Sequence, residues 1–266
     1  MPVVALFHRV GQDLLNLVFP PHCVICRAGG AVLCDACVEH FPRVQPPWCE
    51  CCGEPAAGGS PLVLVRRSAR VRARLGDKGA QGGGRVCQPC QQTPPEIDGI
   101  RSVVLLEGGA RDAVHRLKYG GCSSLAPPLA RLMAEYWRVS PLPADVVAHV
   151  PLYIARQRER GYNQAHLLGR ELGRLLGLPP VSGTLTRARN TRAQVGLDAC
   201  QRHANVRGAF EYESPRRGDG VRGLRVLLVD DVCTTGATLE ACSAALKAAG
   251  AASVWGLTLA RAAWSS

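Results

Sequence analysis

Two adjacent acidic residues, followed by a turn rich in threonine and glycine, are the most informative feature of the chain. Residues 226–238 read VLLVDDVCTTGAT, so that an apolar strand ends in Asp230 and Asp231 and a turn leads into a helix. Gly236 permits a tight turn, threonine hydroxyls donate hydrogen bonds, and the amides of a helix N-terminus favour an anion. The segment therefore predicts a phosphate-binding loop. Its members are Thr234, Thr235, Gly236, Ala237 and Thr238.

The acids beside this loop would repel a phosphate unless they bind another part of the ligand. Ribose hydroxyls and Mg²⁺ are the natural partners for Asp230 and Asp231. A ligand with a phosphate, vicinal hydroxyls and a metal-bound diphosphate is phosphoribosyl pyrophosphate (PRPP). The missing Gly-Lys-Thr sequence excludes a P-loop NTPase, and the glycine spacing does not fit a dinucleotide-binding fingerprint. We expect Cys233, inside the loop, to be a packing residue rather than a nucleophile.

A cationic segment follows another expected strand, at residues 145–151. This segment contains Arg156, Arg158 and Arg160, and it precedes a helix that is expected to start near Gln164. Three cations between a strand and a helix suit a diphosphate, and a solvated basic turn is the alternative. Lys118, in the upstream sequence LKYG, could add a further cation to the same site.

Eight of the 13 cysteines form four C-x-x-C pairs before residue 91. These are Cys23, Cys26, Cys34 and Cys37, followed by Cys49, Cys52, Cys87 and Cys90. One such turn presents two thiolates to a metal ion, and two turns complete a tetrahedral sulfur shell. Because nothing in the sequence marks the chain for export, we expect two structural Zn²⁺ sites rather than disulfides. An interleaved pairing stays open, and Cys51 offers an alternative ligand in the third pair.

Composition divides the 266 residues, which carry a formal net charge of +11, into three parts. Residues 1–19 have apolar side chains at helical spacing and predict an amphipathic helix. Residues 20–96 predict a metal-stabilised double zinc ribbon with a basic, glycine-rich insertion at 62–86. We interpret this insertion as solvated rather than as a nucleic-acid-binding arm, because no aromatic residues interleave with its arginines. Residues 97–266 alternate short β-branched runs with helices, which predicts an α/β domain with a mostly parallel sheet.

The expected elements of the α/β part follow from this alternation. Strands are expected at 100–106, 146–150, 226–229 and 253–260, and helices at 125–137, 164–176 and 238–249. The longest apolar runs are far shorter than the roughly 20 residues that cross a bilayer. We therefore expect no membrane span and a cytoplasmic location.

Together these segments resemble the ComF (competence protein F, also GntX-like) family of amidophosphoribosyltransferase-related proteins. The resemblance covers residues 20–261. It is carried by the cysteine pairs, LKYGG, VPLYIARQRERGYNQA, LTRARNTRAQ, an R-x-x-N-x-x-GAF run, LLVDDVCTTGATLEAC and LTLAR. It implies a type I phosphoribosyltransferase fold preceded by a small double zinc ribbon domain. The long insertion before Cys87 and the additional Cys51 depart from the family pattern.

The resemblance also implies a role for each part of the site. Asp230 and Asp231 would be the catalytic pair that binds the ribose hydroxyls of PRPP, accompanied by Mg²⁺. The loop after them would bind the 5′-phosphate, and the arginine-rich segment after residue 151 would hold the pyrophosphate. A flexible loop that closes over PRPP would contain Thr191, Gln194 and Arg202.

Two kinds of function are compatible with these residues. One is an enzyme that transfers or handles a phosphoribosyl group with Mg²⁺. The other is a non-enzymatic module that binds a nucleotide or single-stranded DNA through the same fold. The resemblance implies a role in DNA uptake during natural transformation, with single-stranded DNA and a helicase-type competence protein as partners. The basic charge fits an anionic ligand in either case.

Overall fold

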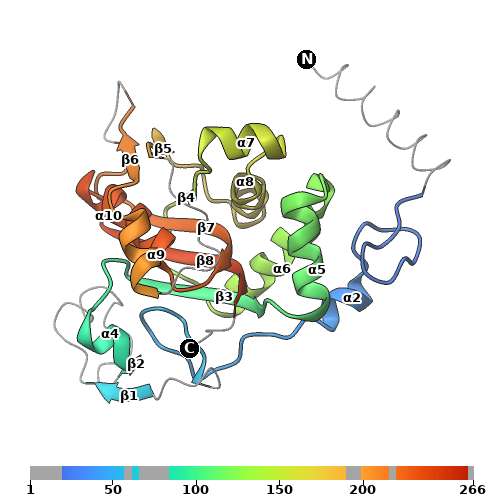
Figure 1. Ribbon diagram of the computed structural model, residues 1–266, viewed down its shortest axis with the longest axis horizontal. Coiled ribbons are helices and arrows are strands. Elements are labelled where there is room, and N and C mark those ends of the chain that lie inside the picture. The colour runs from blue at the N-terminus through green and yellow to red at the C-terminus, as the bar shows by residue number, and fades with distance from the viewer. Residues whose placement is uncertain (1–19, 57–61, 66–83, 190–198, 216–219, 263–266) are drawn as a thin grey trace.

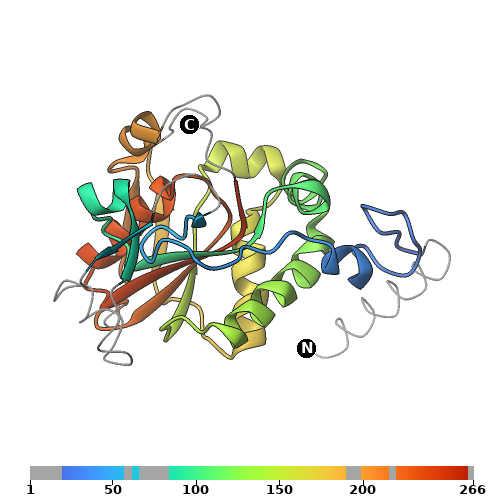
Figure 2. The same ribbon diagram turned by 90° about the horizontal axis from the view of Figure 1, so that it is seen from below.

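A four-stranded parallel sheet with helices on both faces forms the centre of the structure (Figures 1 and 2). The structure, a computed structural model, describes residues 20–56, 62–65, 84–189, 199–215 and 220–262. In spatial order the strands are β3 (Gly99–Leu105), β8 (Ser253–Arg261), β7 (Arg225–Cys233) and β4 (Val146–His149). The parallel order confirms the α/β class predicted from the alternation of strands and helices.

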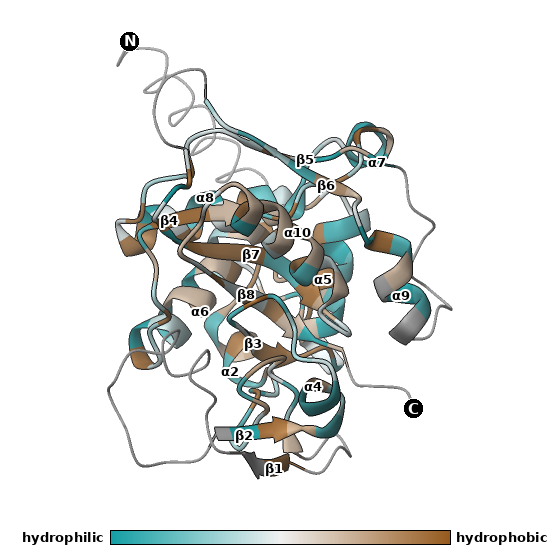
Figure 3. Ribbon diagram, turned by 90° about the vertical axis from the view of Figure 1, so that its left-hand side faces the viewer, coloured by the Kyte–Doolittle hydropathy of each residue, from teal (hydrophilic) through white to brown (hydrophobic). Residues whose placement is uncertain are grey.

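The side chains of β7 alternate between two apolar cores, as the two-residue period of a strand requires. Leu227 and Val229 belong to one core, while Val226 and Leu228 belong to the other. Three helices contribute to the first core: α5 (Gly108–Tyr119), α6 (Ala126–Val139) and α8 (Gln164–Leu176). The second core contains α10 (Ala237–Ala248) and the end of α9 (Ala199–Val206). Figure 3 shows the corresponding concentration of apolar residues on the central strands.

Shorter elements complete the described chain. Beside the main sheet lie the single-turn helix η2 (Ser123–Leu125), the short helix α7 (Ile154–Arg160), and an antiparallel pair formed by β5 (Thr184–Arg187) and β6 (Phe210–Glu213). The cysteine-rich part contains α2 (Asp35–Glu39), the antiparallel pair β1 (Leu62–Val65) and β2 (Gly84–Cys87), and α4 (Gln88–Gln92).

Most expected elements agree with the structure to within two residues, and two expectations need correction. The strand β7 does not end at the acids, because Asp230 and Val232 still pair with Thr258 and Ala260 of β8. The arginine-rich segment after β4 is the helix α7 rather than a loop. Helix α5 and the β5–β6 pair were not expected. The two glycines that start α5 weaken its helical signal.

The cysteine-rich part packs against the α/β part at several places. Leu33 and Phe41 share a core with the α5 residues Ala110 and Ala113. The chain then runs beside the edge strand β3, where the Leu105 amide donates to the Pro42 carbonyl at 2.7 Å. This segment satisfies backbone groups that an open edge would expose.

Two of the expected segments fall wholly or partly outside this description. The amphipathic helix expected at 1–19 lies outside the described residues, as do residues 66–83 of the insertion. Within the described ranges, no helix combines the length and the apolar character needed to cross a bilayer.

Candidate functional site

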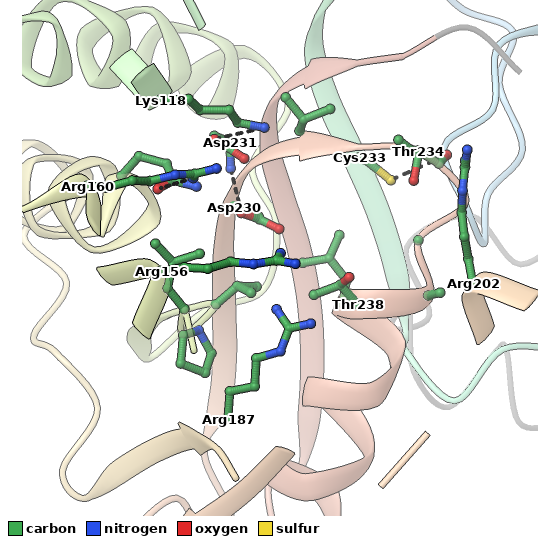
Figure 4. A pocket seen from close by; sticks show the side chains of 18 of the residues that line it. Lys118, Arg156, Arg160, Arg187, Arg202, Asp230, Asp231, Cys233, Thr234 and Thr238 are labelled. Carbon is green, nitrogen blue, oxygen red and sulfur yellow. Dashed lines mark hydrogen bonds and ion pairs between the residues drawn. The ribbon is translucent and has the colours of Figure 1, made fainter. Parts of the chain in front are cut away.

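A pocket of about 610 Å³ lies at the carboxyl ends of β7 and β4 (Figure 4). Ligands of open α/β sheets bind at this edge of the strands. Most of the predicted site residues line it: Asp230, Asp231, Thr234, Gly236, Ala237, Thr238, Lys118, Arg156, Arg160 and Arg202. Of the candidates that the structure describes, Thr235 and Arg158 do not line the pocket, and Arg158 is exposed on α7.

The threonine-rich loop turns sharply at Gly236, the residue that caps the N-terminus of α10. Gly236 has a φ of 86°, and a Cβ atom there would lie only 2.8 Å from Cδ1 of Ile100. The left-handed backbone conformation therefore favours glycine, and a Cβ atom would also displace the end of the Ile100 side chain. Thr235 Oγ1 accepts a hydrogen bond from the Ala237 amide at 3.4 Å. The N-terminal end of α10, where the helix dipole is positive, lines the pocket and can bind an anion.

The two acids are buried at the centre of the pocket. Asp230 is 9% exposed and Asp231 is 3% exposed, and the Asp231 amide donates to Asp230 Oδ1 at 2.8 Å. Burial raises the pKa of Asp230 well above its ordinary value, and the negative charge of Asp231 raises it further. Carboxylate oxygens are ligands that Mg²⁺ prefers, and a cation would relieve this repulsion. The acids therefore fit a divalent cation.

Lys118 faces the acids from the C-terminal end of α5. Its Nζ atom lies 3.3 Å from Oδ2 of Asp231. The end of α5 is held in place by Tyr162, whose hydroxyl donates to the Leu117 carbonyl at 2.6 Å. The predicted contribution of Lys118 to the site thus has a definite partner in Asp231.

Two arginines of α7 extend toward the pocket. Arg160 donates to Gln164 Oε1 at 3.2 Å, and its guanidinium lies 4.7 Å from the centre of the Tyr119 ring. Figure 4 shows the Arg156 side chain extending past Asp230 toward Thr238. Arg160 therefore lies on the α7 side of the acids, whereas Arg156 reaches toward the start of α10.

Arg187 is a pocket residue that the sequence analysis missed. It extends from β5 with its guanidinium 5.4 Å from the centre of the Phe210 ring. Burial lowers its pKa, and the nearby charge of Arg156 lowers it further. The sequence Thr-Leu-Thr-Arg, in which Leu185 is buried, carried a strand signal that could have placed Arg187 on the same face.

The expected flexible loop is described only in part. Thr191 and Gln194 lie outside the described residues. Arg202 belongs to α9 and lies near Thr234, across the pocket from Lys118 (Figure 4).

The cysteines form two clusters of four, each with sulfur atoms within 4.8 Å of one another. One contains Cys23, Cys26, Cys34 and Cys37, and the other contains Cys49, Cys52, Cys87 and Cys90. The pairing is therefore sequential rather than interleaved, and Cys51 is outside the second set. The Cys23–Cys37 and Cys26–Cys34 sulfur atoms are 3.7 and 3.6 Å apart. In the second cluster the Cys52 and Cys87 sulfur atoms are 3.7 Å apart. A tetrahedral Zn²⁺ site with bonds of about 2.3 Å requires a separation of about 3.8 Å, so both clusters are consistent with structural zinc.

Cys233 is a packed thiol beside the loop, as expected. Its sulfur accepts a hydrogen bond from Nη1 of Arg261 at 3.0 Å. Burial raises the pKa of the thiol, which disfavours the thiolate that a nucleophile needs.

Two family models match the chain. The double zinc ribbon domain matches residues 14–66, and the phosphoribosyl transferase domain matches residues 182–263. The first match ends before Cys87 and Cys90, whereas the second includes the acids and the loop. Together with the parallel sheet and the cysteine clusters, these matches define a phosphoribosyltransferase-domain protein that carries a double zinc ribbon.

Relatives identify the family more closely. The DNA utilization protein YhgH of Salmonella typhi is 33% identical over 248 residues, covering 90% of this chain and 96% of the relative. Competence protein F of Haemophilus influenzae is 42% identical over 115 residues, covering 42% of this chain and 49% of that protein. The chain belongs to the family of DNA utilization protein YhgH and competence protein F. Among solved structures, the allosteric regulatory enzyme of purine biosynthesis is 22% identical, with a TM-score of 0.37, over 55% of this chain and 30% of that one.

Proposed function

We propose that the pocket binds PRPP with Mg²⁺ and that the protein transfers or handles the phosphoribosyl group. The observation that carries this proposal is the position of the buried acids between two anion-binding features. Asp230 and Asp231 have the N-terminus of α10 on one side and Arg160 of α7 on the other. An elongated ligand with an anionic group at each end and hydroxyls between them complements this order.

Each part of PRPP has a chemical counterpart in the pocket. The 5′-phosphate would accept hydrogen bonds from the loop Thr234–Thr238, and the ribose hydroxyls would donate to Asp230 and Asp231. The diphosphate would lie toward Arg156 and Arg160. These cations would stabilise the charge that develops on a departing diphosphate. Bound Mg²⁺ would neutralise further charge there.

The cysteine clusters would hold Zn²⁺ and stabilise the fold around the pocket. Closed tetrathiolate sites have no open coordination position, so their role is structural. Because such sites need reduced thiols, we propose that the protein works in the cytoplasm.

A second candidate function is the binding of single-stranded DNA through the same pocket, with or without a helicase-type partner. The names of the relatives, DNA utilization and competence proteins, favour it. So do the described basic side chains around the pocket: Lys118, Arg156, Arg160, Arg187 and Arg202. Binding to several DNA phosphates would weaken steeply as salt rises, which separates the two candidates.

Ligand fragments test the proposed orientation of PRPP. We would measure the thermal stabilisation of the zinc-loaded protein by ribose 5-phosphate, by pyrophosphate with Mg²⁺, and by PRPP with Mg²⁺. Thr238→Val should reduce the stabilisation by ribose 5-phosphate but not by pyrophosphate. Arg160→Gln should do the reverse, and both variants should reduce the stabilisation by PRPP. Arg158→Gln, on the exposed side of α7, is the matched control. Equal losses for both fragments in both variants would contradict the orientation and indicate general anion binding.

A further inference from the structure

A buried ion pair joins the second cysteine cluster to the sheet. Arg261, at the end of β8, is 1% exposed, and Glu54, just after the third C-x-x-C pair, is 2% exposed. Two nitrogens of Arg261 donate to Glu54 Oε2, Nε at 3.1 Å and Nη2 at 2.5 Å. Paired donation of this kind fixes the guanidinium in orientation as well as in position.

The third nitrogen of the same guanidinium contacts both the cluster and the start of the phosphate loop. Nη1 of Arg261 donates to the Cys52 carbonyl at 2.7 Å and to the Cys233 sulfur at 3.0 Å. Cys52 belongs to the second cluster, whereas Cys233 directly precedes Thr234. One side chain therefore bridges the metal-binding segment and the loop that lines the pocket.

A backbone hydrogen bond provides a second connection between the third C-x-x-C pair and the sheet. The Ile100 amide of β3 donates to the Cys51 carbonyl at 2.8 Å. The side chain of Ile100 lies directly beneath the loop, because its Cδ1 atom is the one that a Cβ on Gly236 would meet. The third C-x-x-C pair is thus linked to the start of the phosphate loop through Arg261 and to its underside through Ile100.

We propose that Arg261 is a positioning residue that couples the second cysteine cluster to the phosphate loop. Loss of the cluster would release Glu54 and Cys52, and with them the guanidinium that holds Cys233. The loop would then sample more conformations, and a phosphate ligand would bind it more weakly because the loop must be ordered on binding. The nature of that ligand rests on the function proposed above, whereas the coupling itself does not.

The test is a cycle of variants in the full chain, read out by hydrogen exchange of the amides of residues 234–238 without ligand. Cys90→Ser removes a cluster ligand that lies on α4. The double variant Glu54→Met/Arg261→Met replaces the ion pair with apolar side chains of similar volume, an exchange that proteins often tolerate without loss of stability. The third member combines both changes. Arg225→Gln, which breaks an exposed ion pair with Asp145 at the other end of β7, is the control.

We expect loop exchange to accelerate about tenfold in Cys90→Ser and in the double variant, and to rise little further when they are combined, because coupled changes are not additive. Arg225→Gln should exchange like the wild type. Wild-type exchange in the double variant, with the fold confirmed by its thermal transition, would overturn the proposal. So would independent, multiplying effects in the combined variant.

Titration of PRPP with Mg²⁺ into the same proteins adds the functional readout. We expect the dissociation constant of the double variant to be about tenfold larger than that of Arg225→Gln. If the wild type itself binds no PRPP, the proposed ligand is wrong, and the exchange cycle still decides whether the cluster and the loop are coupled. If the wild type binds and the double variant binds equally well, Arg261 does not position the loop for this ligand.

Discussion

Nζ of Lys118 lies 3.3 Å from Oδ2 of Asp231, so the C-terminal end of α5 supplies a counter-charge to the acids of β7. The pair is shielded from solvent, with side-chain exposures of 21% for Lys118 and 4% for Asp231. The N-terminal half of α5 shares its core with Phe41 of the cysteine-rich part. The segment of the first cluster therefore supports the helix that carries Lys118, while the second cluster is linked to the phosphate loop through Arg261.

Replacement of Lys118 by Gln should weaken the binding of PRPP with Mg²⁺ by about tenfold. The loss of one positive charge leaves the acids less compensated and raises the pKa of Asp230 further, since Lys118 lowers it in the wild type. Calorimetric titration measures the effect. Arg111→Gln, an exposed basic residue of the same helix, is the control. Equal affinities for the two variants would show that Lys118 is not part of the binding site.

Asp230→Asn should stabilise the ligand-free protein and weaken its binding of PRPP. Burial and Asp231 raise the pKa of Asp230, so the folded state holds the proton more tightly than the unfolded chain. The ionised carboxylate therefore costs stability at neutral pH, and an amide removes this cost while keeping an oxygen for the Asp231 amide. One kcal/mol corresponds to about 2–4 °C at this chain length, so we expect a rise of a few degrees. A lower melting temperature with unchanged binding would refute this account of the acids.

Acid should destabilise the protein through His149. Burial, followed by the charge of His166, lowers the pKa of His149 from 6.5 to about 4. Between these values the unfolded chain binds a proton that the folded protein excludes, so stability falls as pH falls, by up to about 1.4 kcal/mol per pH unit. Urea unfolding at about pH 7 and about pH 5 measures this loss, which His149→Gln should reduce. Exposed His115→Gln should leave the loss unchanged, and identical pH dependence in all three proteins would exclude His149 as its source.

Native mass spectrometry should find two Zn²⁺ ions per chain. Cys26→Ser and Cys90→Ser should each retain one ion, because each changes a different cluster. Cys51→Ser is the matched control and should retain both, since Cys51 is outside the second set. Loss of an ion in Cys51→Ser, with retention in Cys90→Ser, would instead identify Cys51 as a ligand.

Features encoded by residues close in sequence could be predicted without the structure. The acids and the loop after them lie within nine residues, from Asp230 to Thr238. Their spacing alone indicates a strand, a turn and a helix N-terminus. The four C-x-x-C pairs are local in the same way, although their partners became definite only in the folded chain.

Features that depend on distant contacts could not be predicted in this way. Arg261 gains its role only because the sheet brings it against Glu54, more than two hundred residues earlier. Arg187 reaches the pocket only through the pairing of β5 with β6. The continuation of β7 past the acids depends on its partner β8 rather than on the apolar pattern of β7 itself.

The measurement that tests the central claim most directly is calorimetric titration of PRPP, with and without Mg²⁺, into the zinc-loaded wild type and Asp231→Asn at two salt concentrations. We predict saturable, Mg²⁺-dependent binding to the wild type, a large loss of affinity in the variant, and a modest dependence on salt. An absence of binding to folded, zinc-loaded wild type, or equal binding by Asp231→Asn, would contradict the PRPP site and favour single-stranded DNA as the ligand to test next.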